Sequence, residues 1–234
     1  MGYSIRGVLF DKDGTLFLFG ATWNEWASIM LLDLVGEDHL RASDLAARMG
    51  YDYAAREFDP SSTVIAGTPD QIVELLLPGV PHLSPAELIQ RINSAAARAP
   101  QVEAVPLAPL INTLRAQGLK LGVATNDAEI PARAHLAGVG QEHAFDFIAG
   151  YDSGYGGKPA PGMCLAFAKA VGLDPSEVIM VGDSAHDLVA GRAAGMRTVA
   201  VLTGMAKEAE LAPLAHVVLP DIGHLPDWIA VQNG

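Results

Sequence analysis

Cysteine, basic residues and long apolar runs are scarce in this sequence. Its 234 residues include one cysteine, Cys164, so no internal disulfide bond can form, and we expect a reducing, cytoplasmic location. There are 15 Lys and Arg residues against 27 Asp and Glu residues. The resulting net charge of −12 argues against a nucleic-acid partner, because phosphate contacts depend on basic side chains. No run of about eighteen apolar residues exists, and no basic start precedes an apolar run, so neither a membrane span nor a secretory signal is predicted.

Short apolar runs punctuated by turn residues predict the core of the fold. Half of the residues are hydrophobic, enough for a sizeable core. We expect buried strands at 7–11, 120–126, 145–150, 177–183, 197–204 and 216–220. Helical patterns at 107–117, 130–137, 161–172 and 186–195 separate the later strands, and the expected stops are Gly118, Gly138, Gly172 and Gly195. This alternation predicts an α/β protein with a doubly wound, parallel, Rossmann-like sheet.

Residues 17–95 break the alternation. Their periodicity predicts helices at 23–34, 38–49, 69–77 and 85–98, and no strand of the core type. Asp38, Thr68 and Ser84 stand where helices should begin. We therefore expect a helical cap at 17–95, inserted into an α/β core made of residues 1–16 and 96–234.

Polar residues collect where the predicted strands end. Ligands of open parallel sheets bind beyond the carboxyl ends of the strands, so these residues should meet at one edge. They are Asp11, Asp13, Gly14, Thr125, Asn126, Asp127, Lys158, Asp183, Ser184 and Asp187.

These residue types suit phosphoryl transfer. Asp11 and Asp183, with Asp187 nearby, offer the hard oxygen ligands that Mg²⁺ prefers, and no His or Cys grouping offers a softer site. A phosphoryl group also needs positive charge and hydrogen-bond donors. Lys158 can supply the charge; the donors can be Thr125, Asn126 and the backbone amides of Asp13 and Gly14. Of the two aspartates at the first turn, one could attack phosphorus while the other moves protons.

Each of these residues also has a purely structural explanation. Gly14 could be needed only for the conformation of the turn, and Thr125 could cap a helix. Asp187 could interact favourably with the dipole of a helix that begins there. Lys158 could be solvated, His186 could have no role at the site, and Cys164 should be a buried apolar residue. In the inserted segment, arginines could bind a substrate carboxylate or could simply be solvated; these are Arg41, Arg48 and Arg56.

Four motifs, in this order, resemble those of the haloacid dehalogenase superfamily, and most closely its phosphoglycolate phosphatase-like members. They are "DKDGTL" at 11–16, "TND" at 125–127, "GGKPAPG" at 156–162 and "GDSAHD" at 182–187. The resemblance implies that Asp11 is the nucleophile and a Mg²⁺ ligand, and that Asp13 is the general acid/base, its backbone carbonyl also contacting the metal. It further implies that Thr125 and Lys158 bind phosphate, with Asn126 as a weaker candidate. Asp183 would be the remaining metal ligand, Asp187 would support the site, and the helical insertion would be a cap.

The expected function is therefore a Mg²⁺-dependent phosphatase acting on a small phosphorylated metabolite, with phosphoglycolate one candidate by resemblance. Asp13 argues against a dehalogenase, which needs no leaving-group acid. The absence of lysine between Lys12 and Lys120 argues against phosphonate cleavage, which uses a cap lysine. A sugar-phosphate mutase and a non-catalytic, phospho-accepting regulatory protein stay open as alternatives. We expect no membrane partner and a monomer or homodimer.

Overall fold

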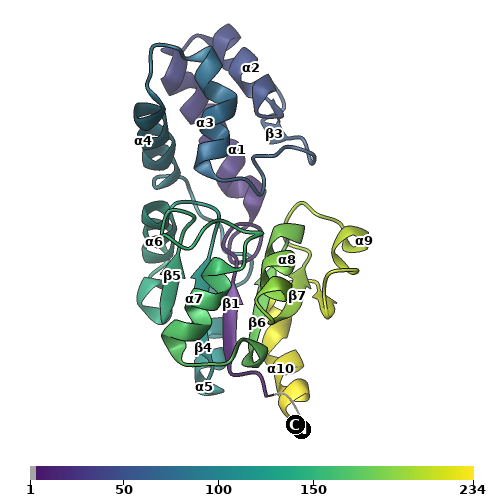
Figure 1. Cartoon of the computed structure of the whole chain (residues 1–234). Helices are drawn as coiled ribbons and strands as arrows, with labels where there is room; N and C mark the ends of the chain where they lie inside the picture. The colour runs from purple at the N-terminus through teal and green to yellow at the C-terminus, as the bar shows by residue number, and fades with distance from the viewer. Residues whose placement is uncertain (1–3) are drawn as a thin grey trace.

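A six-stranded parallel sheet forms the centre of the molecule (Figure 1). The computed structural model describes residues 4–234; residues 1–3 of the predicted core segment 1–16 lie outside the described residues. The strand order is β5-β4-β1-β6-β7-β8. The strands are β1 (Gly7–Phe10), β4 (Lys120–Ala124), β5 (Phe147–Ala149), β6 (Val178–Gly182), β7 (Arg197–Val201) and β8 (Val217–Leu219). Each lies within a predicted run, so the doubly wound α/β fold is confirmed.

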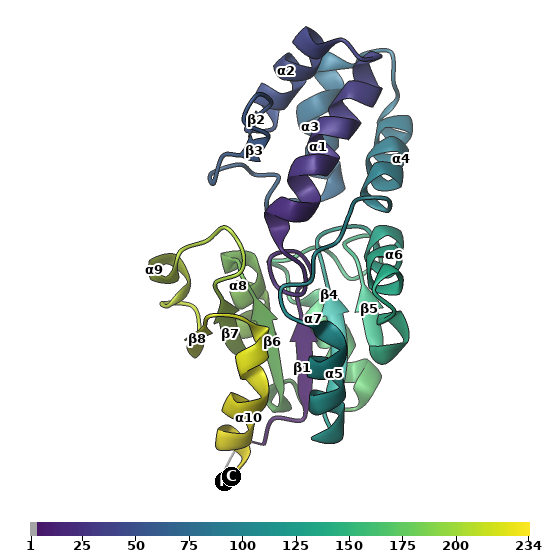
Figure 2. The ribbon, with the colours of Figure 1, turned by 180° about the vertical axis from the view of Figure 1, so that it is seen from behind.

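Helices cover both faces of this sheet because its strands are apolar on both sides. On one face α5 (Leu107–Ala116), α6 (Glu129–Gly138) and α10 (Leu225–Asn233) pack against Val8 and Phe10. On the other, α7 (Gly162–Val171) and α8 (Ala185–Ala193) pack against Leu9 (Figures 1 and 2). Cys164 is buried in α7 among these apolar side chains, as expected. The alternation of Val8, Leu9 and Phe10 between the two layers follows from the two-residue period of a strand.

Four helices and a short hairpin follow β1 and stand beyond the carboxyl ends of the strands (Figures 1 and 2). They are α1 (Phe19–Val35), α2 (His39–Arg48), β2 (Tyr51–Asp52), β3 (Glu57–Phe58), α3 (Pro69–Leu76) and α4 (Pro85–Ala96). They enclose an apolar cluster of their own, with Trp26 and Leu31 at its centre. Asp38, Thr68 and Ser84 are the N-cap residues of α2, α3 and α4, as predicted.

Some elements differ from the sequence-based expectation. Helix α6 ends at Gly138, as predicted, but Gly138 is its last helical residue, and the left-handed residue that follows is Gly140 (φ 70°). The hairpin β2–β3, α9 (Glu208–Leu211) and α10 were not predicted. Residues 4–234 also contain four short 3-10 helices, at Leu77–Gly79, Glu142–Ala144, Pro175–Glu177 and Ile222–His224. Among residues 4–234, every helix is too short or too polar to cross a membrane.

Candidate active site

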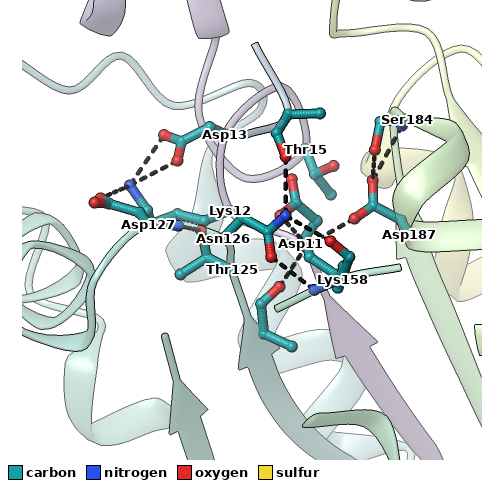
Figure 3. Close-up of polar contacts among 12 residues, drawn as sticks. Asp11, Lys12, Asp13, Thr15, Thr125, Asn126, Asp127, Lys158, Ser184 and Asp187 are labelled. Atoms are coloured by element: carbon teal, nitrogen blue, oxygen red, sulfur yellow. Dashed lines mark hydrogen bonds and ion pairs between the residues drawn. The ribbon is translucent and has the colours of Figure 1, made fainter. Parts of the chain in front are cut away.

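The carboxyl ends of β1, β4 and β6 bring the predicted residues together. Asp11 and Asp13 follow β1, Thr125 and Asn126 follow β4, and Asp183 follows β6. Lys158 comes from the loop between β5 and α7. Figure 3 shows two neighbouring polar groups: Asp11, Lys158 and Asp187 in one, and Lys12, Asp13 and Asp127 in the other. The sheet edge thus collects residues that are up to 176 positions apart in the chain, from Asp11 to Asp187.

Lys158 is a buried cation between two carboxylates. Its Nζ lies 2.5 Å from Asp11 Oδ1 and 2.6 Å from Asp187 Oδ1, and it donates a hydrogen bond of 2.7 Å to the carbonyl of Ala124. Burial alone would lower the pKa of Lys158, but the two carboxylates outweigh it and raise the pKa. Lys158 therefore stays charged, and the interpretation of a solvated lysine is excluded by its burial.

Three buried carboxylates form a potential cation site. Asp11, Asp183 and Asp187 each place one oxygen atom within 4.8 Å of the others. Burial, together with the neighbouring acids Asp187 and Asp13, raises the pKa of Asp11 to about 7, although Lys158 opposes the shift. Burial and the charge of Asp11 also raise the pKa of Asp183. Burial and the proximity of like charges disfavour the ionised form of these carboxylates. A divalent cation prefers hard oxygen ligands and would relieve the repulsion between the carboxylates, so the three side chains fit such an ion.

Asp183 strengthens that fit. Its carboxylate is buried, and the described side-chain hydrogen bond to it is a long one, 3.4 Å from Thr15 Oγ1. Lys158 is already engaged by Asp11 and Asp187. Burying a carboxylate that has so few hydrogen-bond and charge partners destabilises the protein unless a cation binds to it. The carboxylate of Asp13 does not belong to this group, and its predicted metal contact uses the backbone carbonyl instead.

Asp187 has both roles that the sequence suggested, one at the start of a helix and one at the site. Its Oδ2 accepts hydrogen bonds from the amide (3.0 Å) and the hydroxyl (2.7 Å) of Ser184, which forms a capping box at the start of α8. Its Oδ1 pairs with Lys158. The same carboxylate therefore begins a helix and positions the buried lysine.

Gly14 makes the turn and leaves room for a carboxylate. Its φ is 83°, and a Cβ atom at this position would collide with the carboxyl group of Asp183. Its amide donates to the carbonyl of Phe17 (2.7 Å), so the predicted donation from Gly14 to phosphate is not available in this conformation. Its carbonyl accepts a hydrogen bond of 2.6 Å from Thr203, a residue that the sequence did not single out.

The two polar residues after β4 have different surroundings. Thr125 Oγ1 accepts from the amide of Asp127 (3.0 Å), which leaves the hydroxyl proton free to be donated. Thr125 does not cap α6, whose N-cap is Ala128. Asn126 donates both amide hydrogens, to the carbonyls of Ala66 and Lys158 (2.9 Å each). Its oxygen accepts from the amide of Lys158 (2.8 Å).

A second buried charge network surrounds Lys12. The Nζ of Lys12 lies 2.8 Å from Asp13 Oδ2, 3.1 Å from Asp127 Oδ2 and 2.8 Å from His135 Nδ1. It also stands 5.3 Å from the centre of the Trp23 ring. These carboxylates raise the pKa of Lys12 although burial opposes the shift. Burial raises the pKa of Asp127 to about 6, while Lys12 opposes it.

Asp127 was expected at the end of a strand, but the buried network in which Lys12 contacts both Asp127 and His135 was not predicted. The available signal was a lysine between two aspartates at the end of a buried strand. Because side chains alternate along an extended chain, Lys12 should point away from Asp11.

A cavity lies between these groups and the helical segment. Its floor includes Asp11, Asp13, Thr125, Lys158 and Asp183, so the predicted residues face a common space. His186 also lines it, whereas Arg41, Arg48 and Arg56 do not.

Comparison with known proteins identifies relatives of part of the chain. The chain is 35% identical over 120 residues to a phosphoglycolate phosphatase of Rhodospirillum rubrum, which covers 51% of this chain and 50% of that protein. It is 35% identical over 91 residues to a pyrophosphatase of Halalkalibacterium halodurans, covering 39% of this chain and 42% of that protein. The chain thus matches about half the length of these curated relatives or less.

Solved structures resemble the fold over nearly the full length. A structure described as a predicted phosphoglycolate phosphatase from Haemophilus somnus superposes with a TM-score of 0.72 at 17% identity, covering 96% of this chain and 97% of the other. A β-phosphoglucomutase from Clostridium difficile gives 0.68 at 18% identity, covering 98% and 97%. At such identities the likeness concerns the fold. The family model of haloacid dehalogenase-like hydrolases matches residues 5–195, and the chain belongs to this family.

Proposed function

We propose that this chain is a magnesium-dependent phosphatase that hydrolyses a small phosphomonoester through an aspartyl-phosphate on Asp11. The observation that carries the proposal is the position of Lys158, which is buried and bridges Asp11 and Asp187 beside Asp183. A carboxylate nucleophile attacking a phosphate dianion needs compensating positive charge in a site with little water. Lys158 supplies part of that charge, at hydrogen-bond distance from the attacking residue.

The reaction follows from the two aspartates of the first turn. An oxygen of Asp11 attacks phosphorus, and the bond from phosphorus to the alcohol oxygen breaks. Asp13 gives its proton to the leaving alkoxide. Asp13 then takes a proton from water, whose oxygen attacks the phosphoryl group, and the bond to Asp11 breaks to release inorganic phosphate. Both carboxylates return to their starting states, so the cycle balances.

The residues that would hold Mg²⁺ are Asp11, Asp183 and the backbone carbonyl of Asp13, with Asp187 beside them. When bound, the ion would neutralise charge on the phosphoryl oxygens. The free hydroxyl proton of Thr125 supports a role as donor to phosphate. For Asn126 we propose a positioning role in place of phosphate binding, because both of its amide hydrogens are donated to backbone carbonyls.

We further propose that residues 17–95 act as a cap on a core made of residues 1–16 and 96–234. Their separate apolar cluster and their place over the cavity support this division. Closing such a cap would exclude water and select the leaving group.

The test is phosphate release from 4-nitrophenyl phosphate in the presence of Mg²⁺. We expect turnover by the wild-type chain and none by Asp11→Asn. Equal rates for the two proteins would contradict the proposal. Product analysis with sugar monophosphates addresses the mutase alternative, since a mutase returns an isomeric sugar phosphate and a phosphatase returns the free sugar. A phospho-accepting regulatory protein would label itself once without turnover.

A further inference from the structure

The helical segment gives the cavity an apolar and aromatic wall. Opposite the carboxylates, its contribution comes from α1, from the loop before α3, and from α3 and α4. The side chains that matter here are Phe19, Trp23, Trp26, Ile65, Ile72 and Ile92. Trp23 and Trp26 stack edge to face, with ring centres 5.0 Å apart and planes at 83°. A leaving group that extends from phosphorus toward this segment therefore meets rings and aliphatic side chains.

No charged side chain of the helical segment lines the cavity among the described residues, 4–234. The arginines that the sequence offered as partners for a substrate carboxylate lie elsewhere, and Arg56 is exposed and faces Glu25 at 3.6 Å. Lys158 is the lysine that lines the cavity, and both of its carboxylate partners lie within 2.6 Å. The remaining ionisable side chains of the lining are aspartates and His186, which belongs to the core and not to the helical segment.

This wall disfavours anionic and polyhydroxylated leaving groups. A second carboxylate or phosphate that reaches this wall would lose its water and find no cation on the helical segment. Sugar hydroxyls that reach the wall would face apolar side chains, which also weakens binding. An apolar group would gain by leaving water against the aromatic and aliphatic side chains.

We propose that the substrate is the phosphomonoester of an apolar, ring-bearing alcohol whose only charged group is the phosphate. The ring packs against Trp23, Trp26 and Ile72. This inference rests on the proposed phosphatase function and names the substrate class of the same site. It sets the chain apart from a phosphoglycolate phosphatase, whose leaving group carries a carboxylate.

The test compares esters whose leaving groups are alcohols of similar reactivity. We expect kcat/KM for 2-phenylethyl phosphate to exceed that for phosphoglycolate by about 100-fold or more, because an unpaired carboxylate would have to be buried, and also to exceed that for glycerol 3-phosphate. Equal or higher values for either of these two esters would overturn the inference. The activated ester 4-nitrophenyl phosphate serves as the reference: if it too releases no phosphate, the proposed function fails, and this inference fails with it.

Two variants sharpen the result. Ile65 is half-buried in a loop of the cavity wall, so Ile65→Arg adds a cation there without disturbing a helix. It should raise kcat/KM for phosphoglycolate by about tenfold and lower that for 2-phenylethyl phosphate. Leu40→Arg, at an 82% exposed position on α2, is the matched control and should change neither value. If both variants changed the two kcat/KM values equally, the effect would come from net charge, and the proposed selection of substrate by the apolar wall would be overturned.

Discussion

The ammonium group of Lys12 lies 2.8 Å from Nδ1 of His135, in the interior of the protein. The other ring nitrogen of His135 lies 2.7 Å from the carbonyl of Ala96, where α4 ends. Because Lys12 must donate to Nδ1, the ring is neutral and carries its proton on Nε2. This chain of contacts joins the turn after β1 to the segment in which the chain returns from the helical segment to the core. Lys12 lies within the first motif, but neither Lys12 nor His135 was given a role from the sequence.

Lys12→Met should destabilise the protein strongly. Lys12 is fully buried and pairs with Asp13 and Asp127, so the variant leaves two carboxylates without their cation. Loss of one partner of a buried pair costs about 3–5 kcal/mol of unfolding free energy. Urea denaturation would measure it, with the exposed Lys169→Met as control, expected within about 0.5 kcal/mol of wild type. Adding Asp127→Asn to Lys12→Met should recover part of the loss; a further loss of the same size would contradict the pairing.

His135 should make stability fall at acid pH. Burial, and secondly the charge of Lys12, lower the pKa of His135 from 6.5 to about 4 in the folded protein. Between these values the unfolded chain binds the proton and the folded chain does not, so stability rises with pH across this window and is lost as pH falls through it. A shift of this size corresponds to up to about 3 kcal/mol. The advantage of wild type over His135→Asn, from urea denaturation at several pH values, should shrink from pH 6.5 to pH 4; a constant difference would refute the assignment.

Asp11→Asn and Asp13→Asn should fail at different steps. Asp11→Asn removes the attacking oxygen, so no phosphoryl adduct can form. Asp13→Asn keeps the nucleophile, and 4-nitrophenyl phosphate has a leaving group that needs little protonation. This variant should accumulate a phosphoryl adduct on Asp11 and hydrolyse it slowly. Rapid-quench intact-mass spectrometry distinguishes the two, and an adduct on the Asp11 variant would reverse the assigned roles.

Lys158→Ala should lower kcat by about 100- to 1000-fold, the usual effect of removing one preorganised electrostatic donor. The reason is its position between Asp11 and Asp187, where it also faces the site of the phosphoryl group. The half-exposed Lys120→Ala controls for loss of a positive charge, and its rate should stay near wild type. Steady-state kinetics with 4-nitrophenyl phosphate would measure both, and a near-wild-type rate for Lys158→Ala would exclude its catalytic placement.

Mg²⁺ should stabilise the protein as well as activate it. Three buried carboxylates gather their oxygens within 4.8 Å, so a cation relieves their repulsion in the folded state alone. At about 100 times its Kd, the ion should add about 2.7 kcal/mol to the unfolding free energy. Thermal denaturation after EDTA treatment and Mg²⁺ addition should show the shift in wild type, but a much smaller one in Asp183→Asn. Calcium should inhibit turnover, because its higher coordination could engage both oxygens of Asp11. Full activity without metal would contradict the site.

The sequence by itself determined the strands of the core sheet and which residues meet at its edge. Apolar runs of strand length located all six core strands, and local signals such as Asp38, Thr68 and Ser84 located helix starts. The topology of a parallel sheet then brings strand ends together, so Asp11, Lys158 and Asp183 could be grouped without coordinates.

Only the tertiary structure decided what surrounds those residues. Lys12 and His135 are 123 positions apart, and no local pattern encodes their contact. The amide of Asn126 is occupied because the loop at Ala66 and the backbone of Lys158 pack beside it. The aromatic wall over the carboxylates depends in the same way on how α1, α3 and α4 pack over the sheet edge. Secondary structure follows from short-range periodicity, whereas the partners of a buried charge depend on packing between distant segments, which composition and spacing do not specify.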